Sequence, residues 1–454
     1  MKNKNGVNFK QLLLYSLVAA LGGLLFGFDI AIITGAGPFL TIDFGLNSIQ
    51  EGWAYSSLLF GCILGAAVAG RMTDSWGRKR ILIFVAIVFA VTSVWSGLAD
   101  SLTALVIARL AGGLAVGAAS TVSPMYISEV SPAKYRGSLV SMYQLFIVTG
   151  ILISYFINYL LHDIGPNNWR WMFATGAVPS LLFLIMLFFV SETPRFLYLK
   201  GEKEKSMAVL EKIGGKQLAM QEMEEIKRSI SGQSVNFRML LDPSLRKVLI
   251  VGLVLAVFVQ LSGINTIIDY APKIFTTAGW DMNAGLFATF GLGIVNFVST
   301  WVSILIVDKF GRRPLYIIGS AGMTLSLLGL SVAGIIGHFS GLTVLILIIA
   351  FLMFFSSCIG PVFWTYMSEI FPNRIRGTAL SVPVFTQWVF NALVVLVFPS
   401  MLVKLDTAIT FGILAVFAFG QFLFALKFMP ETKGKSLEQI EEMWDISEKK
   451  ESLL

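Results

Sequence analysis

Charged residues are scarce in this sequence. Of its 454 residues only 13% are Asp, Glu, Lys or Arg, against about 25% in soluble domains, while 56% are hydrophobic and the mean hydropathy is +0.78. One globular core cannot bury so much apolar surface, so we expect the chain to lie in a lipid bilayer. The net charge of +7 does not indicate nucleic-acid binding, because no basic stripe alternates with aromatic residues.

Reactive side chains are equally few. Both cysteines, Cys62 and Cys358, lie in apolar segments and are interpreted as small hydrophobic residues, and the two histidines, His162 and His338, fall in or near predicted outer loops. The sequence shows no metal-ligand spacing, no disulfide framework and no pairing of a nucleophile with a base. We therefore expect neither a metal, nor an organic cofactor, nor an enzyme.

Long apolar runs are abundant, and a membrane span needs about 20 such residues. The first run, residues 11–34, is too long for a signal-peptide core and lacks a cleavage site after it, so we expect it to remain as a membrane helix. Twelve spans are predicted, at residues 11–34, 49–71, 81–99, 102–124, 138–160, 171–191, 247–271, 284–307, 315–337, 342–366, 378–402 and 406–428.

Lysine and arginine orient these spans, because cytoplasmic loops carry an excess of both. The loops after spans 1, 3, 5, 7, 9 and 11 hold only Arg170, Lys273 and Lys404. The loops after spans 2, 4, 8 and 10 hold Arg71, Arg78, Lys79, Arg80, Lys134, Arg136, Lys309, Arg312, Arg313, Arg374 and Arg376. We predict a multi-pass protein of the inner (plasma) membrane with both termini in the cytoplasm.

A polar stretch, residues 192–245, separates the first six spans from the last six. Two short amphipathic helices are predicted in it, on either side of Gly214 and Gly215. The tail sequence SLEQIEEMWDI begins with a capping box, from Ser436 to Gln439, and is predicted to form a helix. The expected division is a six-helix half (1–191), a cytoplasmic helical linker (192–245), a second six-helix half (246–430) and a tail (431–454).

The two halves repeat each other. The loop after span 4 reads SEVSPAKYRG and the loop after span 10 reads SEIFPNRIRG, so that acid, proline, arginine and glycine recur at one constant offset. GRMTDSWGRKR after span 2 and IVDKFGRRP after span 8 match at nearly the same offset. Parallel repeats of six spans predict the major facilitator arrangement, an all-α membrane fold with the substrate bound at mid-membrane between the halves.

Charged residues of these repeated loops are candidate gate residues. Ion pairs between helix ends can form while the cytoplasmic side is closed and separate when it opens; each exposed pair contributes only about 0–1 kcal/mol, so the network must act together. The alternative is that the arginines only set topology. The candidates are Asp74, Arg78, Glu129, Arg136, Asp308, Arg312, Glu369 and Arg376.

One carboxylate lies in the middle of a predicted span. Asp29 falls deep in span 1, and Arg109 in span 4 is its expected partner. Because a charge in mid-membrane costs about 2.5–3.5 kcal/mol on insertion scales, such a residue is interpreted as functional. A helix movement that changes the distance between Asp29 and Arg109 would bind or release a proton. The alternative is a permanent structural ion pair.

Taken with SETPRFL after span 6, QLSGIN in span 7, GPVFW in span 10 and PETKGKSLEQIEEMW at the end, the repeated loops give a specific resemblance. Along essentially its whole length the chain resembles the sugar porter family of the major facilitator superfamily, which includes proton–xylose symporters and the facilitative glucose carriers of animals. In proton-coupled members an Asp at the place of Asp29 titrates against the arginine. The resemblance implies that the proton is the coupling ion.

The resemblance also implies a sugar site. Amide side chains offer the donors and acceptors that sugar hydroxyls need, aromatic faces cover the C–H side of a sugar ring, and Gly263, Gly360 and Pro361 are expected to interrupt spans 7 and 10 beside it. A lone amide in a span is also a common contact between helices. The implied residues are Phe26, Gln144, Gln260, Asn265, Asn296, Phe355, Trp364, Gln387, Trp388 and Asn391.

The chain departs from the family pattern at Val259, which replaces a glutamine, and at Asp269-Tyr270, where the family has a Tyr pair. Ile151 stands where the xylose symporter has a glutamine and matches the glucose facilitators instead. These departures leave the sugar open, and Asp269 and Tyr270 are added to the candidate gate residues. The predicted function is a monomeric proton-coupled symporter for a hexose or pentose, in contact with membrane lipid. Facilitated sugar diffusion and proton–polyol (inositol) symport are the alternatives, while a sugar sensor is disfavoured by the short tail.

Overall fold

A computed structural model describes residues 8–231, 245–371, 376–435, 439–440 and 443–444. Over this part of the chain the regular elements are helices, and twelve stretches are long and apolar enough to cross a membrane. They fall at Phe9–Asp43, Ser48–Gly70, Arg78–Gly97, Leu102–Val130, Ser138–Leu161, Asn168–Leu187, Arg246–Asp269, Met282–Val307, Arg312–Ile335, Gly341–Ile370, Ala379–Lys404 and Asp406–Phe428. The predicted number and order of spans are confirmed.

Contacts divide the chain into two compact units: unit 1 is Met1–Gly45 with Ser57–Ser234, and unit 2 is Leu46–Ser56 with Val235–Leu454. The helices up to the polar stretch are α1 (Phe9–Asp43), α2 (Ser48–Trp76), α3 (Arg78–Gly97), α4 (Leu102–Val130), α5 (Ala133–Leu161), α6 (Asn168–Ala174), α7 (Ala177–Leu187), α8 (Pro194–Leu199) and α9 (Lys203–Ser231). Thus α2 begins among residues of unit 2 and continues in unit 1.

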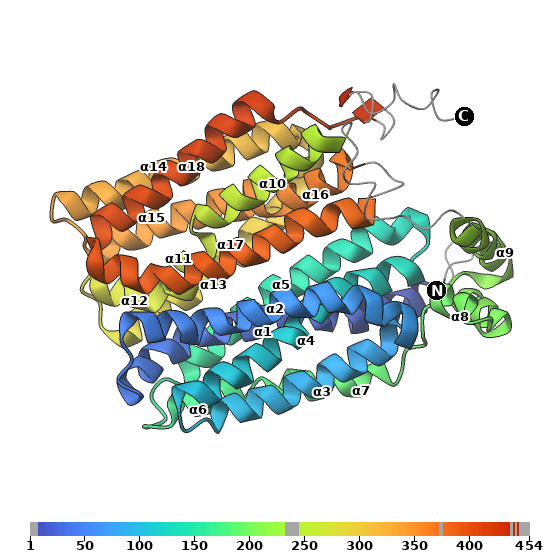
Figure 1. Cartoon of the computed structure of the whole chain (residues 1–454), viewed down its shortest axis with the longest axis horizontal. Helices are drawn as coiled ribbons and strands as arrows, with labels where there is room; N and C mark the ends of the chain where they lie inside the picture. Colours follow the sequence, from blue (N-terminus) through green and yellow to red (C-terminus); the bar gives the residue numbers. More distant parts are fainter. Residues whose placement is uncertain (1–7, 232–244, 372–375, 436–438, 441–442, 445–454) are drawn as a thin grey trace. The chain divides into compact units, whose positions relative to one another are not determined.

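The remaining helices belong to unit 2. They are α10 (Arg246–Leu261), α11 (Ile264–Asp269), α12 (Ala271–Thr277), α13 (Met282–Phe310), α14 (Arg312–Ile335), α15 (Gly341–Phe354), a π-helical turn (Phe355–Ile359), α16 (Gly360–Ile370), α17 (Arg376–Lys404) and α18 (Asp406–Phe428). Within this unit α14 runs beside α18, and α10 packs on α17 (Figure 1).

Glycines bring the helices of unit 1 into close contact. A Cβ atom on Gly27 of α1 would lie 1.9 Å from the carbonyl oxygen of Ile147 on α5, and a Cβ on Gly113 of α4 would lie 2.0 Å from that of Leu58 on α2. Only glycine allows backbones to approach so closely, and this is a common way to pack helices in lipid. Glycines therefore pack these helices of unit 1 together.

Two spans of unit 2 are interrupted where the sequence predicted breaks. Gly263 stands in the left-handed region at φ +83° between α10 and α11, a conformation that favours glycine. The tenth span changes to a π-helical turn at Phe355 before α16 begins at Gly360. Such π-helical turns often occur at functional sites.

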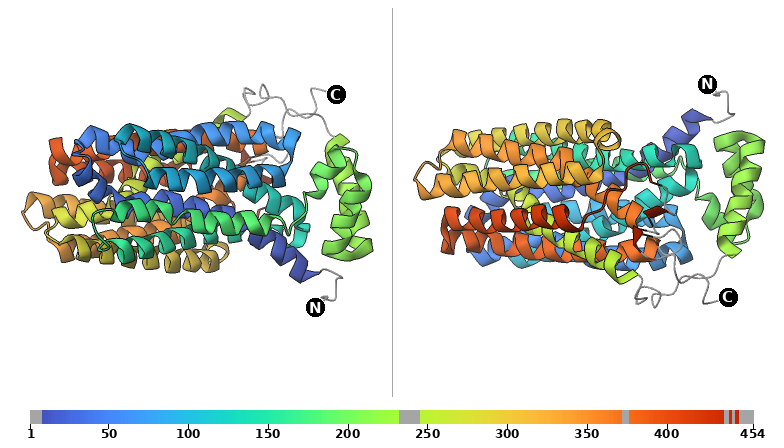
Figure 2. Two further views of the ribbon diagram at one scale, coloured as in Figure 1. Left: turned by 90° about the horizontal axis from the view of Figure 1, so that it is seen from below. Right: turned by 90° about the horizontal axis from the view of Figure 1, so that it is seen from above.

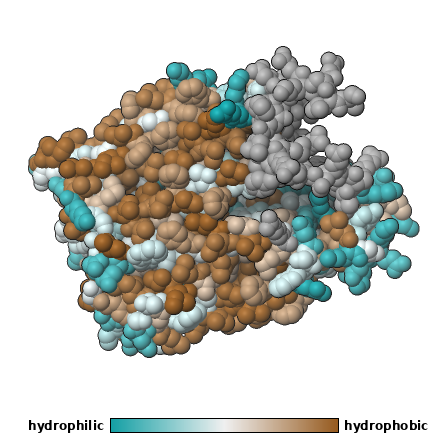
Figure 3. Space-filling view, in the orientation of Figure 1, coloured by the Kyte–Doolittle hydropathy of each residue, from teal (hydrophilic) through white to brown (hydrophobic). Residues whose placement is uncertain are grey.

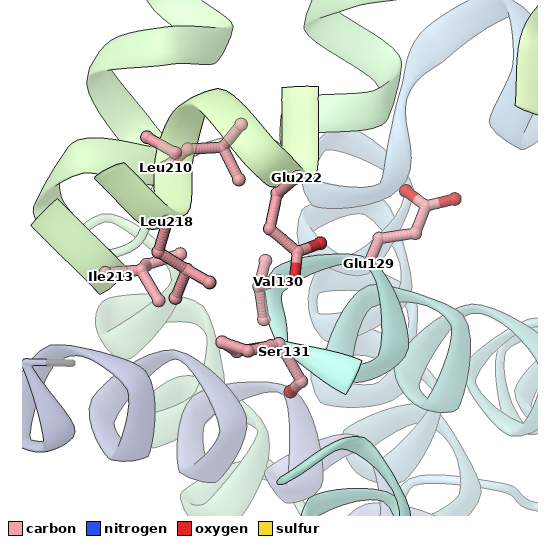
Figure 4. A pocket seen from close by; sticks show the side chains of 10 residues that line it. Glu129, Val130, Ser131, Leu210, Ile213, Leu218 and Glu222 are labelled. Carbon is pink, nitrogen blue, oxygen red and sulfur yellow. The ribbon is translucent and has the colours of Figure 1, made fainter. Parts of the chain in front are cut away.

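The polar stretch of unit 1 forms a kinked helix, α9, whose two parts are short helices. α9 bends at Gly215, where φ is +70°, so the predicted pair of amphipathic helices is confirmed. Its apolar side chains, including Leu210, Ile213 and Leu218, line a small hollow next to Val130 at the end of α4 (Figure 4). In both views of Figure 2 α9 runs across the ends of neighbouring spans of its own unit.

The surface agrees with a lipid environment. Many large apolar side chains are exposed on the spans, among them Val178 at 70%, Leu325 at 69% and Ile335 at 73%. In Figure 3 brown apolar residues cover the sides of the helices, and teal polar residues gather at their ends. Because such exposure is unfavourable in water, the molecule is a multi-pass membrane protein.

The first helix is longer than predicted. The predicted span ends at residue 34, before Gly35, Gly37 and Pro38, but α1 continues to Asp43. Gly35 lies against Asn158 of α5, whose side-chain amide donates to the carbonyl oxygens of Ala31 and Ile32, so packing overrides the local helix-breaking signals. The start of the tail at Ser436 and the side chains of Asp308 and Arg376 lie outside the described residues.

Candidate functional site

Asp29 and Arg109 form the buried ion pair of unit 1. The Arg109 Nη1 atom donates to Asp29 Oδ1 at 2.7 Å and to the Asp29 backbone oxygen at 3.0 Å. The Arg109 side chain is 1% exposed and the Asp29 side chain 15% exposed. The predicted pairing is therefore confirmed. Arg109 is held to α1 both by the Asp29 carboxylate and by the Asp29 backbone carbonyl, and the second contact does not depend on the protonation of the side chain.

Uncharged groups surround the rest of this guanidinium. Its Cζ atom lies 5.4 Å from the ring centre of Phe173, a cation–π distance. The buried Nε and Nη2 atoms of Arg109 have no hydrogen-bond partner among the described residues. Cys62 of α2 lies near both members of the pair. The carboxylate of Asp29 is thus the main counter-charge of Arg109.

Two of the implied sugar-contacting residues belong to unit 1. Phe26 lies on α1 one helical turn before Asp29, and Gln144 lies on α5, the helix that packs on α1. Both side chains are half-buried. They are therefore close in the fold to the helix that carries the ion pair.

The other eight belong to unit 2, and three of their amides lie near its helix breaks. Across the break at Gly263, Asn265 Nδ2 donates to Gln260 Oε1 at 2.7 Å. Asn296 on α13 accepts from Ser356 in the π-helical turn at 2.8 Å. These bonds leave donors or acceptors of the amides for other partners, because each amide can make up to four hydrogen bonds.

Aromatic and further amide residues complete the set in unit 2. Phe355 begins the π-helical turn and is half-buried, whereas Trp364 on α16 is 41% exposed. On α17 Gln387 and Trp388 are half-buried and Asn391 is buried, one turn after Gln387. The predicted sugar residues thus divide into two in unit 1 and eight in unit 2.

Three of the four candidate gate residues of unit 1 form a cluster at the end of α4. Arg78 Nη2 donates to Glu129 at 2.9 Å and lies 3.8 Å from the exposed Asp74. Thr193 donates to Glu129 at 2.6 Å, and Glu192 accepts from the backbone N–H of Arg78 at 3.0 Å. The cluster therefore ties the start of α3 to α4 and to the segment before α8.

Arg136 lies outside this cluster. Its side chain is exposed, and Nη2 reaches the carbonyl oxygen of Ser131 at 3.5 Å. No carboxylate of the described residues forms a salt bridge with it. The structure thus does not place Arg136 in an ion pair.

The same cluster recurs in unit 2. Arg312 donates to Glu369 through Nε at 3.1 Å and Nη2 at 2.7 Å, a two-point contact. Thr432 donates to Glu369 at 2.6 Å, and Glu431 accepts from the backbone N–H of Arg312 at 3.0 Å. The sequence repeat therefore corresponds to a repeated arrangement of side chains.

Sequence reasoning missed the Glu-Thr pairs in these clusters, Glu192-Thr193 and Glu431-Thr432. The signal was present, because SETPRFL and PETKGK each contain Glu-Thr immediately after a half's last span. Each glutamate caps the start of a helix that follows a glycine at φ +92°, Gly77 or Gly311. Their function is to fix that helix start.

A second charged cluster lies in unit 2 at the start of α2. Glu51 forms an ion pair with Lys273, and Tyr55 stacks on Tyr270 with 4.1 Å between ring centres. Tyr270 also donates to the carbonyl oxygen of Val395 at 3.0 Å. Asp269 beside it is buried and lies near both tyrosines. Sequence reasoning predicted Asp269 and Tyr270 but missed Glu51 and Lys273.

The repeated clusters, the interrupted spans and the twelve membrane helices define a membrane carrier with the major facilitator fold. A family model described as "Sugar (and other) transporter" matches residues 15–444. The chain therefore belongs to this family of transporters.

Particular relatives agree along nearly the whole chain. The arabinose-proton symporter of Bacillus subtilis (strain 168) is 38% identical over 439 residues, which cover 95% of each chain. The D-xylose-proton symporter of Escherichia coli (strain K12) is 37% identical over 474 residues, which cover 96% of each. An inward-open structure of the xylose transporter XylE from E. coli matches with a TM-score of 0.85 at 36% identity, over 95% of this chain and 100% of that chain.

Proposed function

We propose that this chain is a proton-coupled symporter that carries a monosaccharide, a hexose or a pentose, by alternating access. The observation that carries the proposal is the Asp29–Arg109 ion pair, in which an acid that can take up a proton is held inside a membrane helix. The proton symporters among the relatives support it. The proton is then the coupling ion, and no other cofactor is required.

The ion pair gives a physical basis for coupling. With Asp29 ionised, its Oδ1 atom neutralises Arg109 and holds α4 to α1. Once Asp29 takes up a proton this attraction falls, while the bond from Arg109 to the Asp29 carbonyl remains. Protonation therefore loosens the contact between two helices of unit 1 without freeing Arg109 altogether.

Sugar selection is assigned to the amide and aromatic residues described above. Gln260 and Asn265 are joined to each other across the break in the seventh span, so a hydroxyl group bound there would meet both at once. The side chain of Val259 is buried and has no hydrogen-bond donor or acceptor, so fewer polar groups are left to contact the sugar hydroxyls. Gln144, Gln387 and Asn391 supply the remaining amides.

The two arginine–glutamate clusters and the Tyr270 cluster are assigned to gating. Arg78–Glu129 and Arg312–Glu369 each join helices within one unit, so each stabilises one end of its own unit. From the distribution of lysine and arginine, we place these ends and both termini in the cytoplasm. The proposed carrier works as a monomer in the inner membrane.

Asp29→Asn tests the coupling. In proteoliposomes with an imposed gradient of one pH unit, one proton per sugar can support about a tenfold accumulation, since both quantities correspond to about 1.4 kcal/mol. We expect the variant to lose accumulation but to exchange labelled sugar between equal pools. Asp100→Asn, which changes an acid whose side chain is 95% exposed, is the matched control and should accumulate normally.

Accumulation by Asp29→Asn would contradict the assignment of this acid. The same vesicles separate the alternatives when labelled glucose, xylose, galactose and inositol are compared with and without the gradient. Uptake of a sugar by the wild type that never exceeds equilibration would show a uniporter. Accumulation of inositol in preference to the sugars would show a polyol symporter.

A further inference from the structure

We propose that Thr92 of α3 accepts the hydrogen bond of the protonated Asp29 carboxyl, and that Gly112 of α4 provides the space in which this bond forms. Thr92 is then a positioning residue for the proton-loaded state. The proposal rests on the assignment of Asp29 as the proton-carrying acid. It concerns a different oxygen from the one that contacts Arg109.

The two oxygens of Asp29 have different surroundings. Oδ1 accepts from Arg109 at 2.7 Å. No hydrogen bond to Oδ2 is found among the described residues, and Oδ2 lies 3.4 Å from the position that a Cβ atom of Gly112 would occupy. A proton added to Oδ1 would meet the Arg109 donor, so Oδ2 is the oxygen that can become a hydroxyl group.

Thr92 lies next to the same space. Its Oγ1 atom is 3.2 Å from the Gly112 Cβ position, and the residue is 5% exposed. Both oxygens therefore border the bare Cα of one glycine. In the proton-loaded state, a change of side-chain torsion or one bridging water molecule would join them.

The hydroxyl of Thr92 is prepared to accept rather than to donate. Its hydrogen is directed to the carbonyl oxygen of Val88 at 2.8 Å, one helical turn earlier on α3. A hydroxyl has one donor and two acceptor sites, so the lone pairs of Oγ1 remain for another donor. Among the described residues nothing donates to Oγ1, and a protonated Asp29 would be such a donor.

The other groups near Asp29 do not replace Thr92 as a hydrogen-bond acceptor. α4 presents Arg109, which is only a donor, and α2 presents the thiol of Cys62, which is a weak acceptor. α5 contributes Tyr143, whose buried hydroxyl lies near Cys62, and α6 contributes the Phe173 ring. Thr92 therefore supplies the strong neutral acceptor for the acid in its protonated form.

Thr92→Val tests the proposal, because valine keeps the shape and removes the hydroxyl. Loss of one neutral hydrogen bond weakens proton binding about 2- to 12-fold, so the pH of half-maximal uptake should fall by about 0.4–1.1 units. Thr92→Ser should restore the wild-type pH profile. Exchange between equal pools, which needs no net proton movement, should be retained in both variants.

Thr324→Val is the matched control. Thr324 lies on α14 and is 6% exposed, and its hydroxyl also donates to the carbonyl four residues earlier, at 2.7 Å from Ser320. No acid of the described residues contacts it. This variant should keep the wild-type pH profile, so that any shift in Thr92→Val reports the loss of the acceptor and not of the helix contact.

Gly112→Ala tests the same space from the other side. Its new methyl group would lie 3.2 Å from Thr92 Oγ1 and 3.4 Å from Asp29 Oδ2 and would crowd both, so the pH profile should move in the same direction as in Thr92→Val. Gly70→Ala on α2, where a Cβ meets no atom within 4 Å, is the control. Should Thr92→Val fail to exchange sugar, Gly112→Ala decides the question by itself.

The outcomes separate this proposal from the proposed function. Accumulation by Asp29→Asn would overturn the coupling assignment and the present proposal with it. If Asp29→Asn is uncoupled but Thr92→Val and Gly112→Ala keep the wild-type pH profile, only the present proposal is wrong. A shift toward higher pH would also overturn it, because Thr92 would then be a donor to the ionised carboxylate.

Discussion

The ion pair between Glu51 and Lys273 is predicted to stabilise the packing of the start of α2 in unit 2. The Glu51 side chain is 5% exposed and that of Lys273 is 27% exposed, so the pair is largely buried. Next to it, Tyr55 stacks on Tyr270, and a Cβ atom on Gly52 would lie 2.1 Å from the carbonyl oxygen of Leu396. The start of α2 therefore packs tightly within unit 2.

Glu51→Gln should loosen this packing. Leaving one charge of a fully buried pair without its partner costs about 3–5 kcal/mol, and because Lys273 is partly solvated we expect about 1.5–3 kcal/mol here. The open fraction of the start of α2 should rise by about 10- to 140-fold, at a factor of ten for every 1.4 kcal/mol. Lys273→Met leaves the more deeply buried Glu51 carboxylate unpaired and should have the larger effect.

A cysteine at residue 56 reports the opening. Ser56 is fully buried, and its hydroxyl has no hydrogen-bond partner among the described residues, so Ser56→Cys removes no such bond. When opening and closing are fast, labelling by a thiol reagent follows the open fraction. The parent protein, whose Cys62 and Cys358 are buried, gives the background rate.

A double-mutant cycle identifies the pair as the cause. In Glu51→Gln combined with Lys273→Met no unpaired charge remains, so labelling should be slower than the two single effects predict together. Effects that simply add would show that Glu51 and Lys273 act independently. An unchanged labelling rate in Glu51→Gln would refute the reasoning from burial.

Two further predictions concern helix breaks and the repeated clusters. Gly263→Ala places alanine at φ +83° with its Cβ atom 2.6 Å from Leu414. It should lower the apparent Tm by more than the control Gly279→Ala, which is strained at φ +90° but whose Cβ meets no atom within 4 Å. Equal losses of Tm would show that the Leu414 contact is unimportant. Arg312→Lys removes a two-point contact with the partly exposed Glu369 and should cost about 1 kcal/mol of stability, seen as a lower apparent Tm. Adding Glu369→Gln to this variant should lower the Tm little further. If Glu369→Gln lowers the Tm as much in the variant as in the wild type, this pair is excluded as the cause.

The order of the spans and the internal repeat follow from the sequence alone. Lipid requires about 20 apolar residues per span, so the run lengths reveal the twelve helices without any knowledge of their packing. Glycine can be placed at helix breaks for a similar local reason, since Gly263 adopts a backbone conformation that other residues avoid. The extension of α1 to Asp43 could not be predicted, because it depends on contacts with Asn158.

The candidate proton site was accessible to sequence reasoning because charge in lipid is costly. Asp29 and Arg109 are charged residues within apolar runs, and each requires a partner, so their pairing could be predicted across 80 positions. The roles of the sugar-contacting residues remain predictions. Their amide chemistry can be recognised in the sequence, but a lone amide in a span also serves contacts between helices.

Only the tertiary structure revealed the neutral partners. Thr92 and Gly112 are ordinary residues of membrane helices, and helical periodicity shows which residues share a face but not which face of another helix they meet. The same is true of Glu51 with Lys273, which are 222 positions apart. The sequence thus determined the number of spans and where charge had to be neutralised, whereas the rotation and contact of the helices decided which uncharged groups surround that charge.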